Sequence, residues 1–432
     1  MLLKELKNKK ILILGFAREG RDTLSFLRKR FPRKKIGIAD QKQGKNYLKN
    51  LADFDLVLRS PGVPLNLPQI QKAIKHGVKF SSATKLFFDL CPAKIIGVTG
   101  TKGKGTTSTV LYNILKKCLP AGRQAATNVL LAGNIGKSPL EILSKVKKNS
   151  LVILELSSFQ LWDLTKSPQI ALVTDIFPDH MDVHKNMAEY LDAKANIVRF
   201  QKKSDTVFYF KDNQLSSKIA GYSHGKKIGL AGEPFGLKKN LVLASAAAAY
   251  LGCPAGKIHQ VVREFKGVEH RMELVRSMKF HSHVLKNMRM SFYNDSASTN
   301  PQTSAAAILQ FGTSHQSLVA SPLILIAGGK DKNLNYRPLA EAIKKSGNVQ
   351  MLILMGENKN KIATAVKSEK IKVKSVKSLK DAIHEAYKFA KNHTTNYLLP
   401  TTILFSPGAA SFDMFKDYAD RGKQFKALVK KL

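Results

Sequence analysis

The sequence has 432 residues, of which 44% are hydrophobic and 24% charged, the balance of a globular protein larger than one ordinary domain. Lysine and arginine total 71 against 31 acidic residues, which gives a formal net charge of +40. The lysines are spread along the whole chain, and no zinc-finger spacing or aromatic-basic RNA signature accompanies them, so we expect no specific nucleic-acid function. A positive field suits an enzyme whose substrates are all anions.

The three cysteines, Cys91, Cys118 and Cys253, are scattered and show no CxxC spacing. This pattern predicts free thiols in a reducing compartment, without a disulfide framework or a zinc site. No stretch approaches the roughly 20 apolar residues that a membrane-spanning helix needs, and the apolar run Ile11–Leu14 is too short for a signal peptide. We therefore expect a cytoplasmic protein without a membrane partner, and we take it to be a monomer.

The first unit reads as alternating strands and helices. An apolar strand at residues 10–16 precedes a helical pattern from Glu19 to Arg30, and a second strand ends in an acid at Asp40. This order is typical of a Rossmann-like nucleotide-binding unit. The glycine turn at residues 15–20 has Ala17 where GxGxxG has its middle glycine, so a tight turn before a helix would explain its glycines equally well.

A second unit starts at Lys94 with the strand KIIGVT, and further strand-like runs lie at Leu151–Leu156 and Ile170–Phe177. The alanine-rich segment Asn240–Leu251 predicts a buried helix. A third unit, from about Arg276, has the strand-like runs MSFYND, LILIAGG, MLILMG and TTILFSPG. Repeated strand–helix alternation predicts an α/β protein of three domains, each a mostly parallel sheet covered by helices. The expected domains are residues 1–92, 93–277 and 278–432.

The strongest local signal is GVTGTKGKGTT at Gly97–Thr107, between an apolar strand and a helical pattern. Its glycines let backbone N–H groups surround phosphate oxygens, and Lys104 supplies a positive charge for the β and γ phosphates. Because Gly105 follows that lysine, a hydroxyl for a metal ion must come from Thr106. The pattern predicts an ATP-binding loop. The residues expected around the phosphates are Gly100, Thr101, Lys102, Gly103, Lys104, Gly105 and Thr106.

Two further residues stand at the ends of predicted strands. Glu155 closes an apolar strand, and a carboxylate in that place lies beside the crevice where ligands bind, so it can hold Mg²⁺ opposite the phosphates. His180 follows the next strand in a polar turn, where a metal ligand, a proton carrier and an ordinary surface residue all remain open. No His-Glu-x-x-His pattern is present, which disfavours a zinc protease.

Nine motifs in order resemble the Mur ligase family: GTKGKGTT, GNIG, ELSSFQL, TDIFPDHMD, AEYLDAKANI, EHRMELV, NDSASTNP, GGKDK and SPGAASFDMFKDYADRG. They run from about residue 97 to residue 422, and SPG at Ser60–Gly62 extends the likeness into the first unit. Within the family the pattern is most similar to the D-glutamate-adding branch. The resemblance implies a Rossmann-like UDP-binding domain, a P-loop ATPase domain and a Rossmann-like domain that binds the amino acid.

The resemblance also implies the chemistry. UDP-N-acetylmuramoyl-L-alanine, D-glutamate and ATP would be the substrates, and the carboxylate would be activated as an acyl phosphate before the amine attacks it. The implied contacts of the UDP substrate are Gly15, Phe16, Ala17, Arg18, Asp40, Ser60, Pro61, Gly62, Asn134, Ser157 and Ser158. Further implied contacts of ATP are Asn240, Arg271, Asn294 and Asp295. Those of glutamate are Thr299, Lys332, Ser411, Phe412 and Tyr418.

Two Mg²⁺ ions are implied, one held by Thr106 and Glu155 with the ATP phosphates and one held by His180 and Lys194. The family carries a carbamylated lysine at the position of Lys194, and CO₂ would convert that cation into an oxygen ligand that a metal can accept. The implied catalytic residues are Lys104, Glu155, His180, Lys194 and Lys332.

The chain departs from the family pattern in places. Ala297 replaces the lysine of NDSKATN, which removes a cation near the glutamate and leaves L-glutamate open as the substrate. Lys102 replaces a common asparagine, and Asn240 alone is retained from the adenine-side block. A folylpolyglutamate synthase also adds glutamate through an acyl phosphate, but it begins with its ATP domain and lacks ELSSFQL. A non-catalytic nucleotide-binding protein, supported by the +40 charge and Ala297, is the alternative from a different class.

Overall fold

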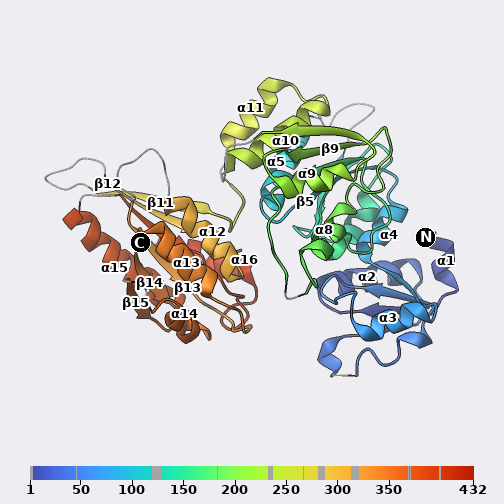
Figure 1. The fold of residues 1–432 in the computed structure, drawn as a ribbon, viewed down its shortest axis with the longest axis horizontal. Helices are drawn as coiled ribbons and strands as arrows, with labels where there is room; N and C mark the ends of the chain where they lie inside the picture. Colours follow the sequence, from blue (N-terminus) through green and yellow to red (C-terminus); the bar gives the residue numbers. More distant parts are fainter. Residues whose placement is uncertain are drawn as a thin grey trace. The chain divides into compact units, whose positions relative to one another are not determined.

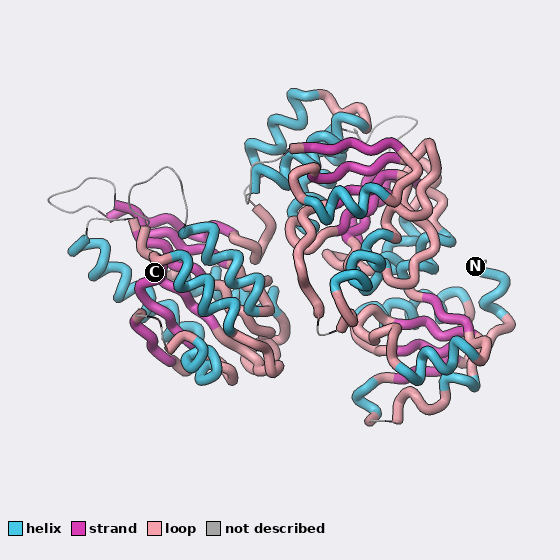
Figure 2. The backbone as a smooth tube through the Cα atoms, viewed as in Figure 1, coloured by secondary structure: helices cyan, strands magenta, loops and turns pink. Residues whose placement is uncertain are grey.

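The computed structural model describes residues 3–44, 46–118, 128–181, 183–231, 237–265, 267–280, 288–312, 321–367, 369, 371–397 and 400–432. The chain forms two compact units, Met1–Phe265 and Lys266–Leu432. Two sheets lie in the first unit and one in the second, and helices pack around each of them (Figures 1 and 2). The predicted α/β fold of three helix-covered sheets is confirmed.

The first sheet has the strand order β2-β1-β3-β4 and is parallel throughout. Its strands are β1 (Ile11–Leu14), β2 (Ile36–Ala39), β3 (Leu56–Arg59) and β4 (Lys79–Ser81). Its helices are α1 (Leu3–Lys7), α2 (Arg18–Arg30), α3 (Pro68–Lys75) and α4 (Ala83–Leu90), with 3-10 turns at Gln41–Gln43 and Leu51–Asp53. The carboxyl ends of β1, β2 and β3 are therefore neighbours at one edge, beside the start of α2.

The second sheet is also parallel, in the order β10-β9-β8-β5-β7-β6. Its strands are β5 (Lys94–Thr99), β6 (Val129–Gly133), β7 (Leu151–Glu155), β8 (Ile170–Val173), β9 (Thr206–Phe210) and β10 (Lys226–Leu230). Because β5 lies between β7 and β8, the loops that follow these three strands open side by side. The glycine-rich loop, Glu155 and the turn that contains His180 are brought together in this way.

The helices around the second sheet include the predicted alanine-rich helix, which is confirmed as α10 and begins at Leu237. They are α5 (Lys104–Cys118), α6 (Pro139–Ile142), α7 (Ser158–Leu161), α8 (Met187–Ala195), α9 (Gln214–Gly221), α10 (Leu237–Tyr250) and α11 (Ala255–Glu264), with a 3-10 turn at Leu143–Lys145. Helices α5 and α10 pack against each other, which brings Asn240 of α10 to the loop that precedes α5.

The third sheet has the order β11-β12-β16-β13-β14-β15. Its strands are β11 (Glu273–Phe280), β12 (Met288–Asn294), β13 (Leu323–Ala327), β14 (Val349–Leu354), β15 (Lys372–Ser375) and β16 (Thr401–Phe405). Its helices are α12 (Pro301–Gly312), α13 (Arg337–Ser346), α14 (Lys359–Ala365), α15 (Leu379–Tyr397) and α16 (Tyr418–Lys430). All neighbours are parallel except β11, which pairs antiparallel with β12 at the edge.

Strand β11 was not among the predicted strands. Its sequence, ELVRSMKF, mixes charged and apolar residues without the continuous apolar run of a strand buried on both faces. The expected domain boundary at residue 277 falls inside this strand, whereas the second compact unit begins at Lys266.

Successive residues of the central strands enter different hydrophobic clusters. In β7, Val152 and Leu154 pack into one cluster while Ile153 packs into another. In β13, Leu325 and Ile326 divide in the same manner. Since successive side chains of a strand point to opposite faces, both faces of these sheets are buried, which explains the unbroken apolar runs in the sequence.

Candidate active site

The glycine-rich loop joins β5 to α5, and its shape requires glycine at two positions. Gly100 has φ +148° and Gly103 has φ +86°, a region that other residues rarely adopt. A Cβ atom on Gly100 would lie 1.8 Å from Thr174 Oγ1, and one on Gly103 would lie 2.0 Å from Asn240 Oδ1. These glycines therefore bring the loop backbone against β8 and α10, where its N–H groups can surround an anion.

Hydrogen bonds from both sides hold this loop. The backbone N–H groups of Thr101 and Lys102 donate to the carbonyl oxygen of Asp175, at 2.8 and 3.3 Å. Lys104 Nζ donates to the carbonyls of Gly100 and Thr101, at 2.9 and 3.1 Å. The ammonium group thus lies over the loop, at the N-terminus of α5, where a phosphate group would also be attracted.

Glu155 ends β7 with 1% of its surface exposed. Its Oε1 accepts a hydrogen bond from Asn134 Nδ2 at 3.2 Å, and its backbone carbonyl accepts one from Asn134 N at 2.9 Å. The other carboxylate oxygen, Oε2, is buried and has no hydrogen-bond partner within the described residues. An unpartnered buried carboxylate oxygen is costly unless it meets a cation, so this residue fits the role of a Mg²⁺ ligand. Thr106, half-buried in the first turn of α5, offers the matching hydroxyl.

Lys194 lies in α8 and is almost completely buried, with 2% exposure. Its Nζ donates to the carbonyl of Gly100 at 2.9 Å and lies 4.7 Å from the centre of the Tyr190 ring. Burial lowers the pKa of Lys194 well below its usual value, and the nearby positive charge of Lys104 lowers it further. A neutral amine is the form that can react with CO₂, so the environment fits a carbamylated lysine.

His180 lies in the turn after β8, with φ +58° and a side chain 39% exposed. Its ring centre is 4.8 Å from that of Phe159 and 6.5 Å from that of Tyr190, and its Nε2 lies 3.5 Å from Asp179 Oδ2. The ring of Tyr190 therefore lies near both His180 and Lys194, the two residues expected to bind the second metal ion.

In the first sheet, the expected nucleotide-binding residues meet where β1, β2 and β3 end. Ser60 Oγ donates to the carbonyl of Gly15 at 2.6 Å, and Phe16 N donates to Asp40 Oδ2 at 2.6 Å. The backbone hydrogen bond from Phe16, together with one from the N–H of Lys42, lowers the pKa of Asp40. Ala17 is the N-cap of α2 and supplies no side-chain hydrogen bond to it, and Pro61, next to Ser60, is half-buried. A hollow of about 510 Å³ lies beside this turn, lined by Phe16, Arg21, Leu24, Ser25, Arg28 and Lys29.

In the second unit, the expected ATP contacts Asn294 and Asp295 are buried and hydrogen-bonded. Asp295 accepts hydrogen bonds from the hydroxyls of Ser298 and Ser406, at 2.5 and 2.7 Å, and burial raises its pKa to about 6. Asn294 Nδ2 donates to the carbonyl of Gly422 at 3.2 Å. Both residues hold loops at the carboxyl ends of β12 and β16, whereas the expected phosphate contact Arg271 is exposed.

Three expected glutamate-binding residues have accessible side chains. Lys332 is exposed, and its Nζ lies 5.7 Å from the centre of the Phe412 ring. Phe412 is 64% exposed and Tyr418 41% exposed. Thr299 is half-buried and Ser411 is buried. Lys332 and Phe412 are thus brought together from segments 80 residues apart in the sequence.

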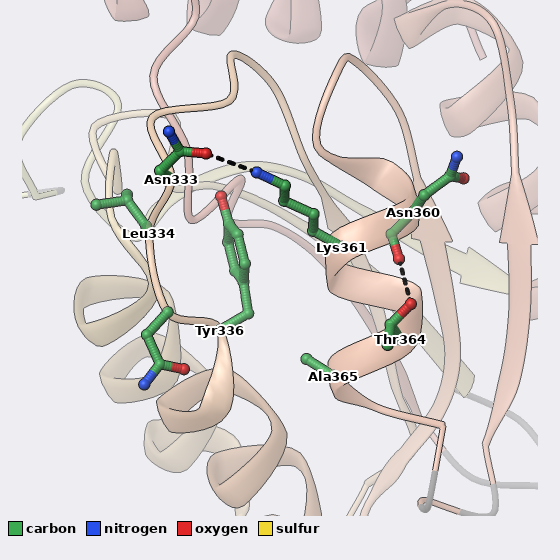
Figure 3. Close-up of a pocket in the computed structure, with 8 residues that line it drawn as sticks. Asn333, Leu334, Tyr336, Asn360, Lys361, Thr364 and Ala365 are labelled. Carbon is green, nitrogen blue, oxygen red and sulfur yellow. Dashed lines mark hydrogen bonds between the residues drawn. The ribbon is translucent and has the colours of Figure 1, made fainter.

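The segment that directly follows Lys332 lines a hollow of about 540 Å³ (Figure 3). Lys361 forms an ion pair with Asp331 and donates to Asn333 Oδ1 at 2.8 Å. The residues that line the hollow are Asn333, Leu334, Asn335, Tyr336, Asn360, Lys361, Thr364 and Ala365. These contacts fix the segment that presents Lys332.

The family assignment follows from known proteins. A model described as the Mur ligase middle domain matches residues 98–314. The chain is 33% identical to the UDP-N-acetylmuramoylalanine–D-glutamate ligase of Acetivibrio thermocellus, over 99% of this chain and 97% of that protein. It is 34% identical to the ligase of the same name from Symbiobacterium thermophilum, over 90% and 87%. The chain belongs to the Mur ligase family.

Solved structures support the fold of this Mur ligase. The MurF ligase of Thermotoga maritima in complex with ADP superimposes with a TM-score of 0.55, over 99% of this chain and 97% of that chain, at 16% identity. E. coli FolC in complex with DHPP and ADP also reaches a TM-score of 0.55, over 81% and 92%, at 16% identity. At these identities the likeness concerns the fold alone.

Several polar residues of this Mur ligase were not expected from the sequence. Arg59, at the end of β3, is fully buried, donates to the carbonyl of Val63 at 2.7 Å and lies 3.5 Å from Asp163. Lys239, beside Asn240, is 5% exposed, and its Nζ lies 2.7 Å from Asp175 Oδ1 and 3.0 Å from an oxygen of Asp212. For Arg59, the available sequence signal was its position as a charged residue at the end of an otherwise apolar strand.

Two more unexpected residues hold the site loops. His184 is buried, its Nε2 lies 3.0 Å from Ser158 Oγ, and its ring stacks on Phe159. Arg421 is fully buried in the second unit and donates to the carbonyls of Ser296 and Ala409, at 2.8 and 3.0 Å. Both residues are buried and hydrogen-bond to these loops, and no local pattern in the sequence reveals that they are buried.

Cys91, Cys118 and Cys253 are free thiols, as predicted. In the part of the chain that the structure describes, no helix is both long and apolar enough to cross a bilayer.

Proposed function

We propose that this chain is a ligase of peptidoglycan precursor synthesis that uses ATP to join D-glutamate to UDP-N-acetylmuramoyl-L-alanine. The observation that carries the proposal is its identity of 30–34%, over nearly its whole length, to ligases named for this reaction. The arrangement of the phosphate loop, Glu155 and Lys194 at adjacent strand ends supports it. ATP, the nucleotide-linked carboxylate and glutamate are the substrates.

Lys104 supplies positive charge beside the terminal phosphates of ATP while the phosphoryl group moves to the substrate carboxylate. Its ammonium donates to two carbonyls of the loop, and phosphate oxygens replace them as acceptors when ATP binds. Asn240 packs against Gly103 and receives a hydrogen bond from Thr107, which keeps the loop in its open shape. The neutral amine of glutamate then attacks the acyl carbon, the bond from that carbon to the phosphate oxygen breaks, and the proton lost by the nitrogen passes to water.

Thr106 and Glu155 would hold one Mg²⁺ ion, and His180 with a carbamylated Lys194 would hold a second. When bound, these ions neutralise charge on the transferring phosphoryl group and on the acyl phosphate. Two features of this chain fit such ligands: the Oε2 of Glu155, which has no hydrogen-bond partner among the described residues, and the buried amine of Lys194.

The first sheet would bind the UDP part, through the turn that begins at Gly15 and through Asp40 and Ser60. Asn134 would face the sugar and alanine portion, together with Ser157. In the second unit, Lys332 and the aromatic side chains of Phe412 and Tyr418 would bind glutamate, and Thr299 and Ser411 would add hydroxyl groups.

Release of phosphate from ATP tests the proposal, measured with UDP-N-acetylmuramoyl-L-alanine and either D-glutamate or L-glutamate. We expect turnover with D-glutamate. Turnover with L-glutamate alone would keep the ligase and overturn its stereochemistry, and this alternative has a specific basis, because Ala297 leaves Lys332 without the second lysine of the family motif. Turnover with a folate substrate alone, or with no substrate, would overturn the proposal.

A further inference from the structure

The turn of residues 15–19 is fixed firmly within the first sheet. Gly15 has φ +86° and receives a hydrogen bond on its carbonyl from Ser60 Oγ at 2.6 Å. The next N–H, that of Phe16, donates to Asp40 at 2.6 Å. The end of the turn, where α2 begins, therefore holds a fixed position relative to the predicted UDP-binding residues.

Arg18 projects from this turn to the second sheet. Its Nη1 donates to the carbonyl of Gly136 at 3.0 Å, and its Nη2 donates to the carbonyl of Gly133 at 3.2 Å. One planar guanidinium therefore donates hydrogen bonds to both glycines of the GNIG loop, which lies at the end of β6. Because the two donors form a rigid fork, this contact fixes the orientation of the loop as well as its distance.

The GNIG loop in turn supports Glu155. Asn134 donates to the carboxylate through Nδ2 and to the carbonyl through its backbone N–H. A Cβ atom on Gly133 would lie only 2.2 Å from the carbonyl oxygen of Glu155, so loop and strand are in closest backbone contact. A displacement of the loop must therefore move or release the carboxylate.

Glu19, the next residue, contacts helix α7, which begins three residues after Glu155. Its Oε1 accepts a hydrogen bond from Gln160 Nε2 at 2.7 Å, and both groups are buried. Gln160 forms a capping box with Ser157 at the start of α7, two residues after Glu155. Arg18 and Glu19 thus hold the two segments that flank the carboxylate.

We propose that Arg18 and Glu19 are positioning residues that couple binding of the UDP-linked substrate in the first sheet to the affinity of the central site for ATP with Mg²⁺. This inference rests on the proposed function. It changes the expected role of Arg18 from a contact of the UDP part of the substrate to a support of the GNIG loop. Coupling between two sites is reciprocal, so each ligand raises the affinity for the other by the same factor.

Calorimetric binding of a non-hydrolysable ATP analogue with Mg²⁺, with and without saturating UDP-N-acetylmuramoyl-L-alanine, measures this factor. We expect the factor to be about 5-fold or more in the wild type. Arg18→Met should reduce it to less than about 2-fold and raise the Mg²⁺ concentration for half-maximal activity about 10-fold. The affinity for UDP alone should not change.

Matched variants separate coupling from general damage. Glu19→Ala should lose the coupling, whereas Glu19→Gln should retain it, because a glutamine oxygen can still accept from Gln160. Arg30→Met, at the exposed far end of α2, should behave as the wild type.

Three results would overturn the inference: no coupling in the wild type, unchanged coupling in Arg18→Met, or weakened binding of UDP alone in Arg18→Met without an effect on ATP. Failure of the proposed function is distinguishable, since it would appear as wild-type protein that couples the two ligands but transfers neither glutamate isomer.

Discussion

The Arg59→Met variant removes one partner of a buried ion pair between β3 and the segment that follows α7. The side chain of Arg59 is 0% exposed and that of Asp163 10% exposed, with 3.5 Å between the charged atoms. Arg59 also donates to the carbonyls of Val63 and Phe159, at 2.7 and 3.2 Å. Methionine fills much of the space but supplies none of these donors.

The cost can be worked out from this geometry. At 3.5 Å, two unit charges attract by about 5 kcal/mol at an effective dielectric constant of roughly 20. Breaking a buried pair by removing one partner costs about 3–5 kcal/mol, because the remaining charge is uncompensated. We therefore expect Arg59→Met to lower the free energy of unfolding of the first unit by about 4 kcal/mol.

Trp162 is the only tryptophan of the chain and directly precedes Asp163, so its fluorescence during urea unfolding reports on this region. Arg59→Met, Asp163→Asn and the double variant complete a cycle, in which the double variant should cost less than the sum of the single ones by about 1–3 kcal/mol. Lys137→Met, which breaks an exposed pair with Glu141, should cost less than about 1 kcal/mol. A cost of Arg59→Met no larger than this control, or additive single variants, would refute the reasoning.

Lys194→Ala should abolish turnover, and a short carboxylic acid such as propionate should restore part of it by replacing the carbamate oxygens; absence of recovery would count against the carbamate. Burial raises the pKa of Asp295 to about 6, so its ionised form destabilises the fold above that pH and ceases to do so below the unfolded pKa of about 3.9. Calorimetric scans should show wild type gaining on the order of 3 kcal/mol over Asp295→Asn between pH 7 and pH 4, and a constant difference would contradict this. Gly133→Ala should raise the half-saturating Mg²⁺ concentration about 10-fold by displacing Glu155. Gly136→Ala, where a Cβ atom meets nothing within 4 Å, is its control, and equal effects would show that backbone strain alone is responsible.

The sequence by itself determined the elements and the chemistry that depend on local pattern. Runs such as those in β5, β7 and β13 are unbrokenly apolar because both faces of a parallel sheet are buried, so they could be recognised without coordinates. The phosphate loop could be recognised because glycines at positive φ and Lys104 must stand at fixed spacing between strand and helix. The edge strand β11 was not predicted, because a strand at the edge of a sheet does not need a continuous apolar run.

Only the tertiary structure decided which polar residues are buried and what they contact. Arg59 pairs with a carboxylate 104 positions away. The sequence around Lys194 does not distinguish it from other lysines, whereas the structure buries it against Gly100 and Tyr190. Arg18 reads as part of a nucleotide-binding turn, yet its donors meet carbonyls more than 110 residues further along the chain. The physical reason is that burial, desolvation and pairing depend on segments brought together by the sheets, and the local pattern around a residue carries no record of those partners.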